Sequence, residues 1–145
     1  MGTARKKGRK KLTPLPKLDA KLWKLFSLWI RQKYAKDGYV ECITCPAKKH
    51  WREMQAGHFV PRGSKKVKFD EKNVHPQCGA CNGFRMKHGT AVYEYGIRID
   101  EMYGSGTAEG LRKAEGVTHK ITRAKYEELI KHYTKLLKEN NFETK

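Results

Sequence analysis

The chain has 145 residues, about the length of one ordinary domain, so two complete domains are not expected. Its 32 lysines and arginines outnumber its 15 acidic residues, and the formal net charge is +17. Such a surface attracts polyanions by releasing their condensed counterions, which makes DNA or RNA the expected partner. The longest apolar-leaning stretch, 22–30, contains Lys24 and is far too short to span a bilayer, which argues against a membrane role.

The four cysteines indicate a metal site rather than disulfide bonds. No apolar segment follows the basic N-terminus, so no secretory signal is predicted and the chain is expected to stay in the cytoplasm. Thiols remain reduced in that compartment, where closely spaced cysteines are typical of metal binding.

Residues 1–17 are predicted to form a disordered, cationic arm that contacts DNA. Pro14 and Pro16 oppose regular structure at its end. A nuclear-localisation signal is a weaker interpretation of the same charges. The cations of the arm are Arg5, Lys6, Lys7, Arg9, Lys10 and Lys11.

The segment 18–37 is predicted to contain an amphipathic helix over residues 19–36. Asp19 is placed to cap its start, and Asp37 with Gly38 to end it. Its aromatic residues share one stripe with aliphatic residues, so we expect them in the core rather than on a base-stacking surface. The stripe consists of Leu22, Leu25, Phe26, Trp29 and Ile30.

The region 38–103 is expected to form the functional core. Short β-prone pieces at 39–42 and 58–60 indicate strands, and Gly89 is expected to end a short helix over 78–87. Residues 90–103 fit two patterns, of which we favour a helix. A helix would align Val92, Tyr95, Ile99 and Met102, whereas a strand would align Tyr93, Tyr95, Ile97 and Ile99.

Two segments complete the chain. Four glycines predict a mobile linker over 104–121 around one weak helical turn. The segment 122–145 is predicted to contain a helix over residues 123–139, with Thr122 as its N-cap. One apolar face of this helix must dock on the domain or on another copy of the chain, and it consists of Tyr126, Leu129, Ile130, Tyr133, Leu136 and Leu137.

Two Cys-x-x-Cys pairs predict a structural zinc site, because this spacing brings two thiolates to one tetrahedral ion from a tight turn. A redox role would require a thioredoxin-like βαβ context, which the sequence lacks. The insert between the pairs is longer than a plain zinc ribbon needs, so we expect it to carry the function. The predicted ligands are Cys42, Cys45, Cys78 and Cys81.

The insert and its flanks carry motifs in a characteristic order: Gly57-His58-Phe59, Asn73-Val74-His75, Gln77-Cys78 and Cys81-Asn82. On these residues the region 42–103 resembles zinc-containing HNH nucleases and, more narrowly, the lambdoid phage NinG/Rap recombination nucleases. The resemblance implies an α+β fold with a zinc-stapled ββα-metal (HNH) core at 38–103, flanked by N- and C-terminal α-helices. It also implies a metal-dependent endonuclease for branched DNA, such as a Holliday junction or a D-loop, in the host cytoplasm if a phage encodes it.

Phosphodiester hydrolysis needs a base to activate water and a divalent cation to stabilise charge on the phosphate. By resemblance, His58 on the first strand is the general base, and Asn73 on the second strand holds its imidazole tautomer. Asn82, beside the zinc ligand Cys81, presents an oxygen to the catalytic ion, which is Mg²⁺ or Mn²⁺.

The chain departs from the HNH pattern immediately before the expected base. Many HNH enzymes have a metal-binding Asp or His there, whereas this chain has Gly57. The candidates to replace the missing ligand of the catalytic ion are His88, Asp70 and Glu53. Alternatively, His58 itself binds the ion.

Basic residues near the expected base are predicted to bind the phosphates that flank the cut. Alternatively, these residues form a solvated surface that binds no phosphate. They comprise a loop after His58 with Arg62, Lys65, Lys66 and Lys68, and two helical residues, Arg85 and Lys87.

Two other functions remain open on the sequence. One is a general or sequence-directed HNH nickase, which would cut linear duplex well. The other is a non-catalytic zinc-finger DNA-binding protein, in which Gly57 signals lost catalysis. Two-fold cleavage of a junction would favour a homodimer, and the apolar face of the C-terminal helix offers a surface for it.

Overall fold

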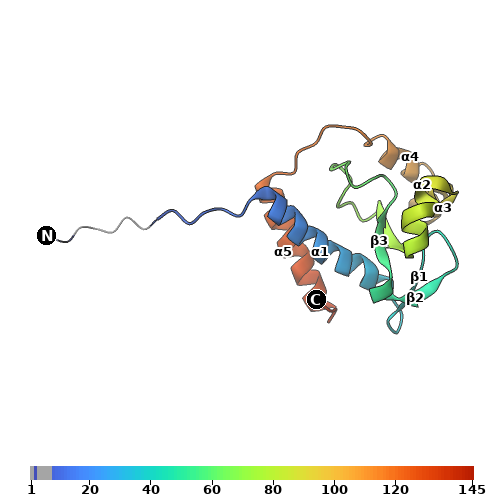
Figure 1. The fold of residues 1–145 in the computed structure, drawn as a ribbon, viewed down its shortest axis with the longest axis horizontal. Coiled ribbons are helices and arrows are strands. Elements are labelled where there is room, and N and C mark those ends of the chain that lie inside the picture. Colours follow the sequence, from blue (N-terminus) through green and yellow to red (C-terminus); the bar gives the residue numbers. More distant parts are fainter. Residues whose placement is uncertain (1, 3–7) are drawn as a thin grey trace.

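The computed structural model describes residues 2 and 8–145, and it has an α+β fold as predicted (Figure 1). No helix in this described part is both long and apolar enough to cross a membrane. The elements in chain order are α1 (Leu15–Lys33), β1 (Tyr39–Glu41), β2 (Lys48–His50), η1 (Trp51–Glu53), β3 (Gln55–His58), β4 (Val74–Gln77), η2 (Cys81–Arg85), α2 (Met86–His88), α3 (Ala91–Tyr103), α4 (Thr107–Arg112) and α5 (Arg123–Glu139).

The first helix begins at Leu15, so the predicted arm of residues 1–17 is too long at its C-terminal end. Pro14 is the N-cap and Pro16 lies in the first turn, where a proline breaks no helical hydrogen bond because the first N–H groups have no partner. Residues 8–14 extend away from the body of the protein (Figure 1). The predicted contribution of Arg5, Lys6 and Lys7 lies outside the described residues.

The predicted boundary signals of this first helix are displaced. Asp19 lies inside α1 and does not cap it; its carboxylate accepts hydrogen bonds from Lys68 and Tyr126 instead. The helix ends at Lys33, and Asp37 and Gly38 form the following turn, with φ angles of 52° and 83°. These positive angles suit Gly and Asp in a tight turn that leads into β1.

Two small antiparallel sheets carry the central region. In the second sheet, β3 pairs with β4, and His58 lies opposite Val74. The strand covers 55–58 rather than the predicted 58–60, so His58 is its last residue. Because side chains alternate along a strand, Ala56 and His58 share one face of the sheet, while Gly57 lies on the other.

Helices α1 and α5 lie side by side and form the first part of the core (Figure 1). Leu22, Phe26 and Ile30 of α1 pack with Tyr126 and Tyr133 of α5. The helix α5 has the predicted bounds, and the side chain of Thr122 caps it by accepting from the Lys125 N–H. Its apolar face therefore docks on the domain, with Tyr126, Tyr133 and Leu137 buried.

Helices α3 and α4 build a second part of the core beside β3. The favoured helix over 90–103 is confirmed, with Tyr95 and Ile99 fully buried. The segment predicted as a mobile linker contains α4, which packs through Ala108 and Leu111 against the same cluster. The Asp100 carboxylate also accepts a hydrogen bond from the Ala108 N–H at 2.9 Å, which anchors α4 to α3.

Candidate functional site

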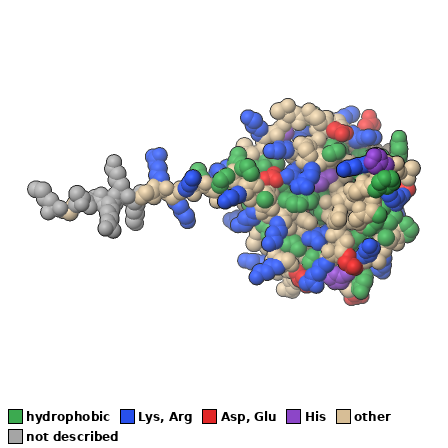
Figure 2. Space-filling model, in the orientation of Figure 1, with side chains coloured by type: hydrophobic (Ala, Val, Ile, Leu, Met, Phe, Trp, Pro, Cys, Tyr) green, Lys and Arg blue, Asp and Glu red, His purple; other side chains and the backbone are tan. Residues whose placement is uncertain are grey.

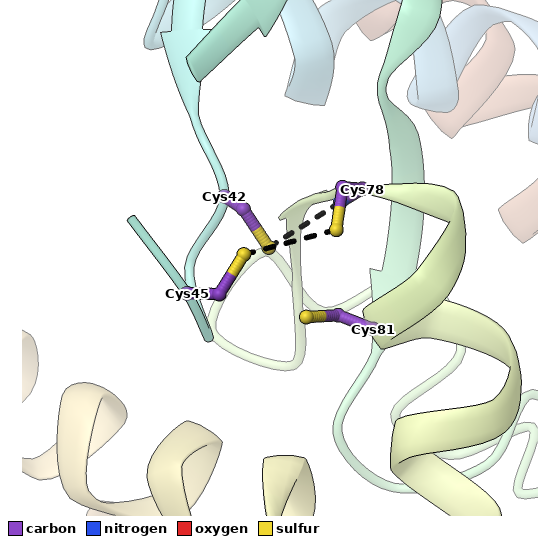
Figure 3. Close-up of side chains that lie close together, drawn as sticks. All are labelled: Cys42, Cys45, Cys78 and Cys81. Atoms are coloured by element: carbon purple, nitrogen blue, oxygen red, sulfur yellow. Dashed lines mark hydrogen bonds between the residues drawn. The ribbon is translucent and has the colours of Figure 1, made fainter. Parts of the chain in front are cut away.

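The four cysteines form one cluster, in which all sulfur atoms lie within 4.8 Å of one another (Figure 3). All four thiols are free. The Sγ atoms of Cys45 and Cys78 are 3.8 Å apart, close to the roughly 3.8 Å edge of a tetrahedral site with Zn–S bonds of about 2.3 Å. The predicted ligands are therefore brought together, and they can hold a zinc ion.

Hydrogen bonds favour the thiolate form of Cys42, whereas burial raises the pKa of Cys45 and of Cys78. Burial raises the pKa of Cys42, but the Thr44 hydroxyl and the Cys78 N–H outweigh this effect and lower it to about 7. Arg85 donates to the Cys81 sulfur at 3.0 Å and pairs with Glu94 at 3.3 Å. Arg85 was predicted to bind phosphate, but its guanidinium lies beside the sulfur cluster, where it offsets the charge of the thiolates.

A cleft of about 710 Å³ brings together two of the three predicted catalytic residues, His58 and Asn82. Glu115 is the only carboxylate among its lining residues. The opening has the dimensions and charge expected for a phosphate-bearing ligand. Four cations line it: Arg31, Arg62, Lys87 and Arg112. Lysine and arginine side chains are also spread over the face seen in Figure 2, where acidic side chains are fewer.

His58 is held at the cleft in one tautomer. Its Nε2 lies 2.9 Å from the carbonyl oxygen of Lys68, which can only accept a hydrogen bond, so Nε2 carries the proton. Nδ1 therefore holds the lone pair that could accept a proton or bind a cation. The ring stacks on Trp23, with centroids 5.0 Å apart, and the guanidinium of Arg62 lies over Trp23 at 5.4 Å.

The environment of His58 keeps its ring neutral. Burial lowers the pKa of His58 to about 4, and the nearby charges of Arg62 and Lys68 act in the same direction. The hydrogen bond to the Lys68 carbonyl opposes this shift only in part. At neutral pH the imidazole is consequently available as a base or as a metal ligand.

The role predicted for Asn73 requires correction, because its side chain does not contact His58. Its Oδ1 accepts from the Val60 N–H at 2.7 Å, and its Nδ2 donates to the carbonyls of Val60 and Val67. Asn73 precedes β4 and is fully buried, so these bonds fix the loop that follows His58. The Lys68 carbonyl holds the imidazole tautomer instead.

The glycine before His58 has a packing explanation. A Cβ at Gly57 would lie 1.9 Å from Oε1 of Gln77, which is fully buried. A side chain there would also project from the opposite face of β3 to His58. The close approach of Gln77 therefore requires glycine, whatever the metal content of the cleft.

None of the residues predicted to replace a ligand at this position lines the cleft. His88 is exposed, and its ring lies 5.0 Å from that of Phe84. Asp70 and Glu53 are likewise absent from the lining residues. Within the described part of the chain, the cysteines are the only cluster of three or more His, Cys, Asp or Glu residues with ligand atoms close enough to hold a metal ion.

The structure places only some of the predicted phosphate-binding residues in the cleft. Arg62 and Lys87 line the cleft, whereas Lys68 is buried and forms an ion pair with Asp19. Lys65 lines a separate pocket, and Lys66 is exposed outside the cleft.

Sequence reasoning missed two cations of the cleft. Arg31 lies on the polar edge of α1, and Arg112 lies in the segment taken for a linker. The position of Arg31 at the edge of an amphipathic stripe is only a weak indication of a binding residue. Nothing in the sequence identifies Arg112 as a residue of the cleft.

A chain of buried and half-buried polar side chains on the other face of β3 was also missed. Tyr95 donates to the Gly57 carbonyl at 2.6 Å, so its oxygen accepts from Nδ1 of His75 at 3.1 Å. Nε2 of His75 then accepts from Tyr103 at 2.8 Å, and the Tyr34 hydroxyl lies 3.3 Å further along. Burial lowers the pKa of His75 to about 4, so its ring stays neutral.

The structure thus defines an α+β protein with a four-cysteine cluster beside a cationic cleft. The chain belongs to the NinG family: the family model described as Bacteriophage Lambda NinG protein matches residues 2–143. No curated protein and no solved structure matches the chain.

Proposed function

We propose that this protein is a metal-dependent DNA endonuclease that cuts branched recombination intermediates, with His58 as its general base. One observation carries the proposal: His58 and Asn82 line the same cleft as four cations, and Nδ1 of His58 has a free lone pair. The branched substrate is implied by the resemblance to the phage recombination nucleases, and the family match shows membership of the NinG family.

The residues of the cleft suit phosphodiester hydrolysis. Nδ1 of the neutral His58 ring can take a proton from water, and the cations offset the charge of the bound phosphates. Nδ2 of Asn82 donates to Oε1 of Gln55 at 2.7 Å, which leaves its Oδ1 free. That amide oxygen and the carboxylate of Glu115 are donors of the kind that Mg²⁺ and Mn²⁺ prefer. A cation held there would stabilise charge on the phosphate.

Zinc has a structural role in this proposal. The η2 turn contains both Cys81 and Asn82, so an ion bound by the four thiolates would fix the start of the turn that presents Asn82. Arg85, which contacts the Cys81 sulfur, supports the same turn.

A non-catalytic zinc-dependent DNA-binding protein is the second candidate. It is favoured by the lack of a second cluster of acidic or histidine ligands in the described part of the chain. Such a protein would use the same cleft and cations to hold DNA without cutting it. A general or sequence-directed nickase is distinguished from the main proposal by its substrate alone.

Cleavage of a labelled four-way junction and of linear duplex with the same sequence, in Mg²⁺ or Mn²⁺, tests these alternatives. The variants are His58→Ala and, as a matched control, His132→Ala, which changes an exposed histidine on α5. Preferential junction cutting that is lost only in His58→Ala supports the proposal. Equal cutting of both substrates identifies a general nickase, whereas binding without cutting identifies the DNA-binding protein.

A further inference from the structure

A second groove of about 390 Å³ lies between α3 and α4, which are neighbours in Figure 1. Tyr93 and Ile97 of α3 line it, together with Arg112 of α4 and the buried ring of Phe59. Tyr93 is 72% exposed and Ile97 is 60% exposed, one helical turn apart. Both side chains therefore leave large apolar surfaces open to solvent on the same side of α3.

A glycine in the middle of α3 widens this groove by the volume of one side chain. A Cβ at Gly96 would lie 3.4 Å from Cζ of Phe59 and 3.8 Å from Cβ of Ala108. Glycine inside a helix costs stability relative to alanine, so its presence calls for a local reason. Here the absent side chain leaves space between the two helices above Phe59.

The groove adjoins the cationic cleft. Phe59, Val92 and Arg112 line both spaces, and Phe59 directly follows His58 in the chain. The guanidinium of Arg112 lies 5.8 Å from the centre of the Phe59 ring, where the cleft meets the groove. A polymer bound in the cleft would therefore lie next to the groove.

The chemistry of the groove suits a nucleobase rather than a phosphate. Its lining includes the carboxylates of Asp100 and Glu109, which repel phosphate but accept hydrogen bonds from the N–H groups of a base edge. The Tyr93 ring lines the groove and is 72% exposed, so it is accessible for stacking on a base. Aromatic platforms beside a cationic backbone track are how proteins bind unpaired bases.

We propose that the groove between α3 and α4 holds an unpaired nucleobase, stacked on Tyr93, of a DNA strand whose phosphates lie in the cationic cleft. This inference rests on the proposed function only for the presence of DNA in the cleft; it does not require cleavage. A base can enter the groove only where it is unpaired, so the groove favours bulges and branch points over continuous duplex.

The test compares a short duplex that carries one bulged 2-aminopurine with a duplex in which the same base is paired, with Ca²⁺ in place of Mg²⁺. The full-length chain and Tyr93→Ala are measured by fluorescence of the base and by the Kd for each duplex. We expect Tyr93→Ala to weaken binding of the bulged duplex roughly 5- to 100-fold and to leave the paired duplex unchanged. Tyr93→Phe should retain the affinity, because its ring still stacks.

Tyr39→Ala is the matched control, since Tyr39 is 51% exposed on β1 and lines neither space. If Tyr93→Ala changes neither Kd, or both equally, the groove holds no unpaired base. Concentration-dependent self-association that Tyr93→Ala abolishes would also overturn the inference, by assigning this face to a protein contact. Wild-type protein that binds neither duplex would instead overturn the proposed function.

Discussion

Nε2 of His58 donates its proton to the main-chain carbonyl of Lys68, over 2.9 Å. Lys68 belongs to the loop between β3 and β4, and its buried ammonium forms an ion pair with Asp19 of α1. Tyr126 of α5 donates to the same carboxylate at 2.8 Å. The orientation of His58 is therefore tied to both long helices through one acidic side chain.

Removing the charge of Asp19 is expected to destabilise the protein. The Lys68 side chain is only 9% exposed, so Asp19→Asn leaves a buried ammonium without its counter-charge. Breaking such a pair costs about 3 kcal/mol in the free energy of unfolding. Urea denaturation measures this change, and Glu139→Gln, which breaks the exposed pair with Lys135, is the control. That control should lower the free energy of unfolding by less than about 0.5 kcal/mol. Equal losses in the two variants would show that the pair of Asp19 and Lys68 contributes no more to stability than an exposed ion pair.

Acid should destabilise the fold through its buried histidines. Burial lowers the pKa of His58 and of His75 from 6.5 to about 4. Below pH 6.5 the two histidines bind protons in the unfolded chain, whereas in the folded protein they bind them only near pH 4. The stability is therefore complete above pH 6.5 and is lost as the pH falls toward 4, by roughly 3 kcal/mol for each histidine.

Urea denaturation between pH 7.5 and 4.5, with zinc in excess, measures this acid sensitivity. His58→Gln should remove about half of the loss, because only His75 then remains as a buried imidazole. An unchanged pH dependence in that variant would mean that His58 titrates alike in the folded and the unfolded chain. Excess zinc keeps protonation of the cysteines from dominating the result.

The sequence predicted what depends on local spacing and missed what depends on the approach of distant segments. The periodicity and Thr122 cap of α5, and the paired cysteines, lie within short stretches, and the structure confirms the helix and the cluster. The partners of Asn73 and the close contact of Gly57 with Gln77 arise only when β3 and β4 pair. Proline also misled the prediction, since Pro14 and Pro16 start a helix instead of preventing one.

Zinc is expected to hold the centre of the fold together. Cys78→Ser removes one of the four thiolates, and structural zinc contributes roughly 10–16 kcal/mol in small peptides, so the central region should unfold. Metal content and thermal melting measure the loss, and a chelator should have the same effect on wild-type protein. Ser105→Ala, at an exposed position between α3 and α4, is a control for handling. A Cys78→Ser protein that lacks zinc and still melts cooperatively at the wild-type temperature would refute the structural role.

The Gly57 and Gln77 pair predicts a rescue. Gly57→Ala places a Cβ 1.9 Å from Oε1 of Gln77, an overlap that should cost about 1–3 kcal/mol. Gln77→Ala alone should also destabilise, because it leaves a cavity and removes the hydrogen bond to Thr44. In the double variant the clash is gone, so the combined loss should be smaller than the sum of the two. Additive losses in denaturation would show that the two side chains do not meet.

The basic arm is expected to set the salt dependence of DNA binding. Because α1 begins at Leu15, deleting residues 1–13 leaves Pro14 as its N-cap and removes only the cations that precede the helix. The slope of log K against log salt should become shallower by at most about 0.9 for each phosphate that the arm contacts. Replacing residues 1–13 by a Gly/Ser segment of equal length should have the same effect, because charge rather than length carries the interaction. A slope equal to that of the wild type in both proteins would mean that the arm contacts no phosphate, and the cleft cations would then supply the whole electrostatic attraction.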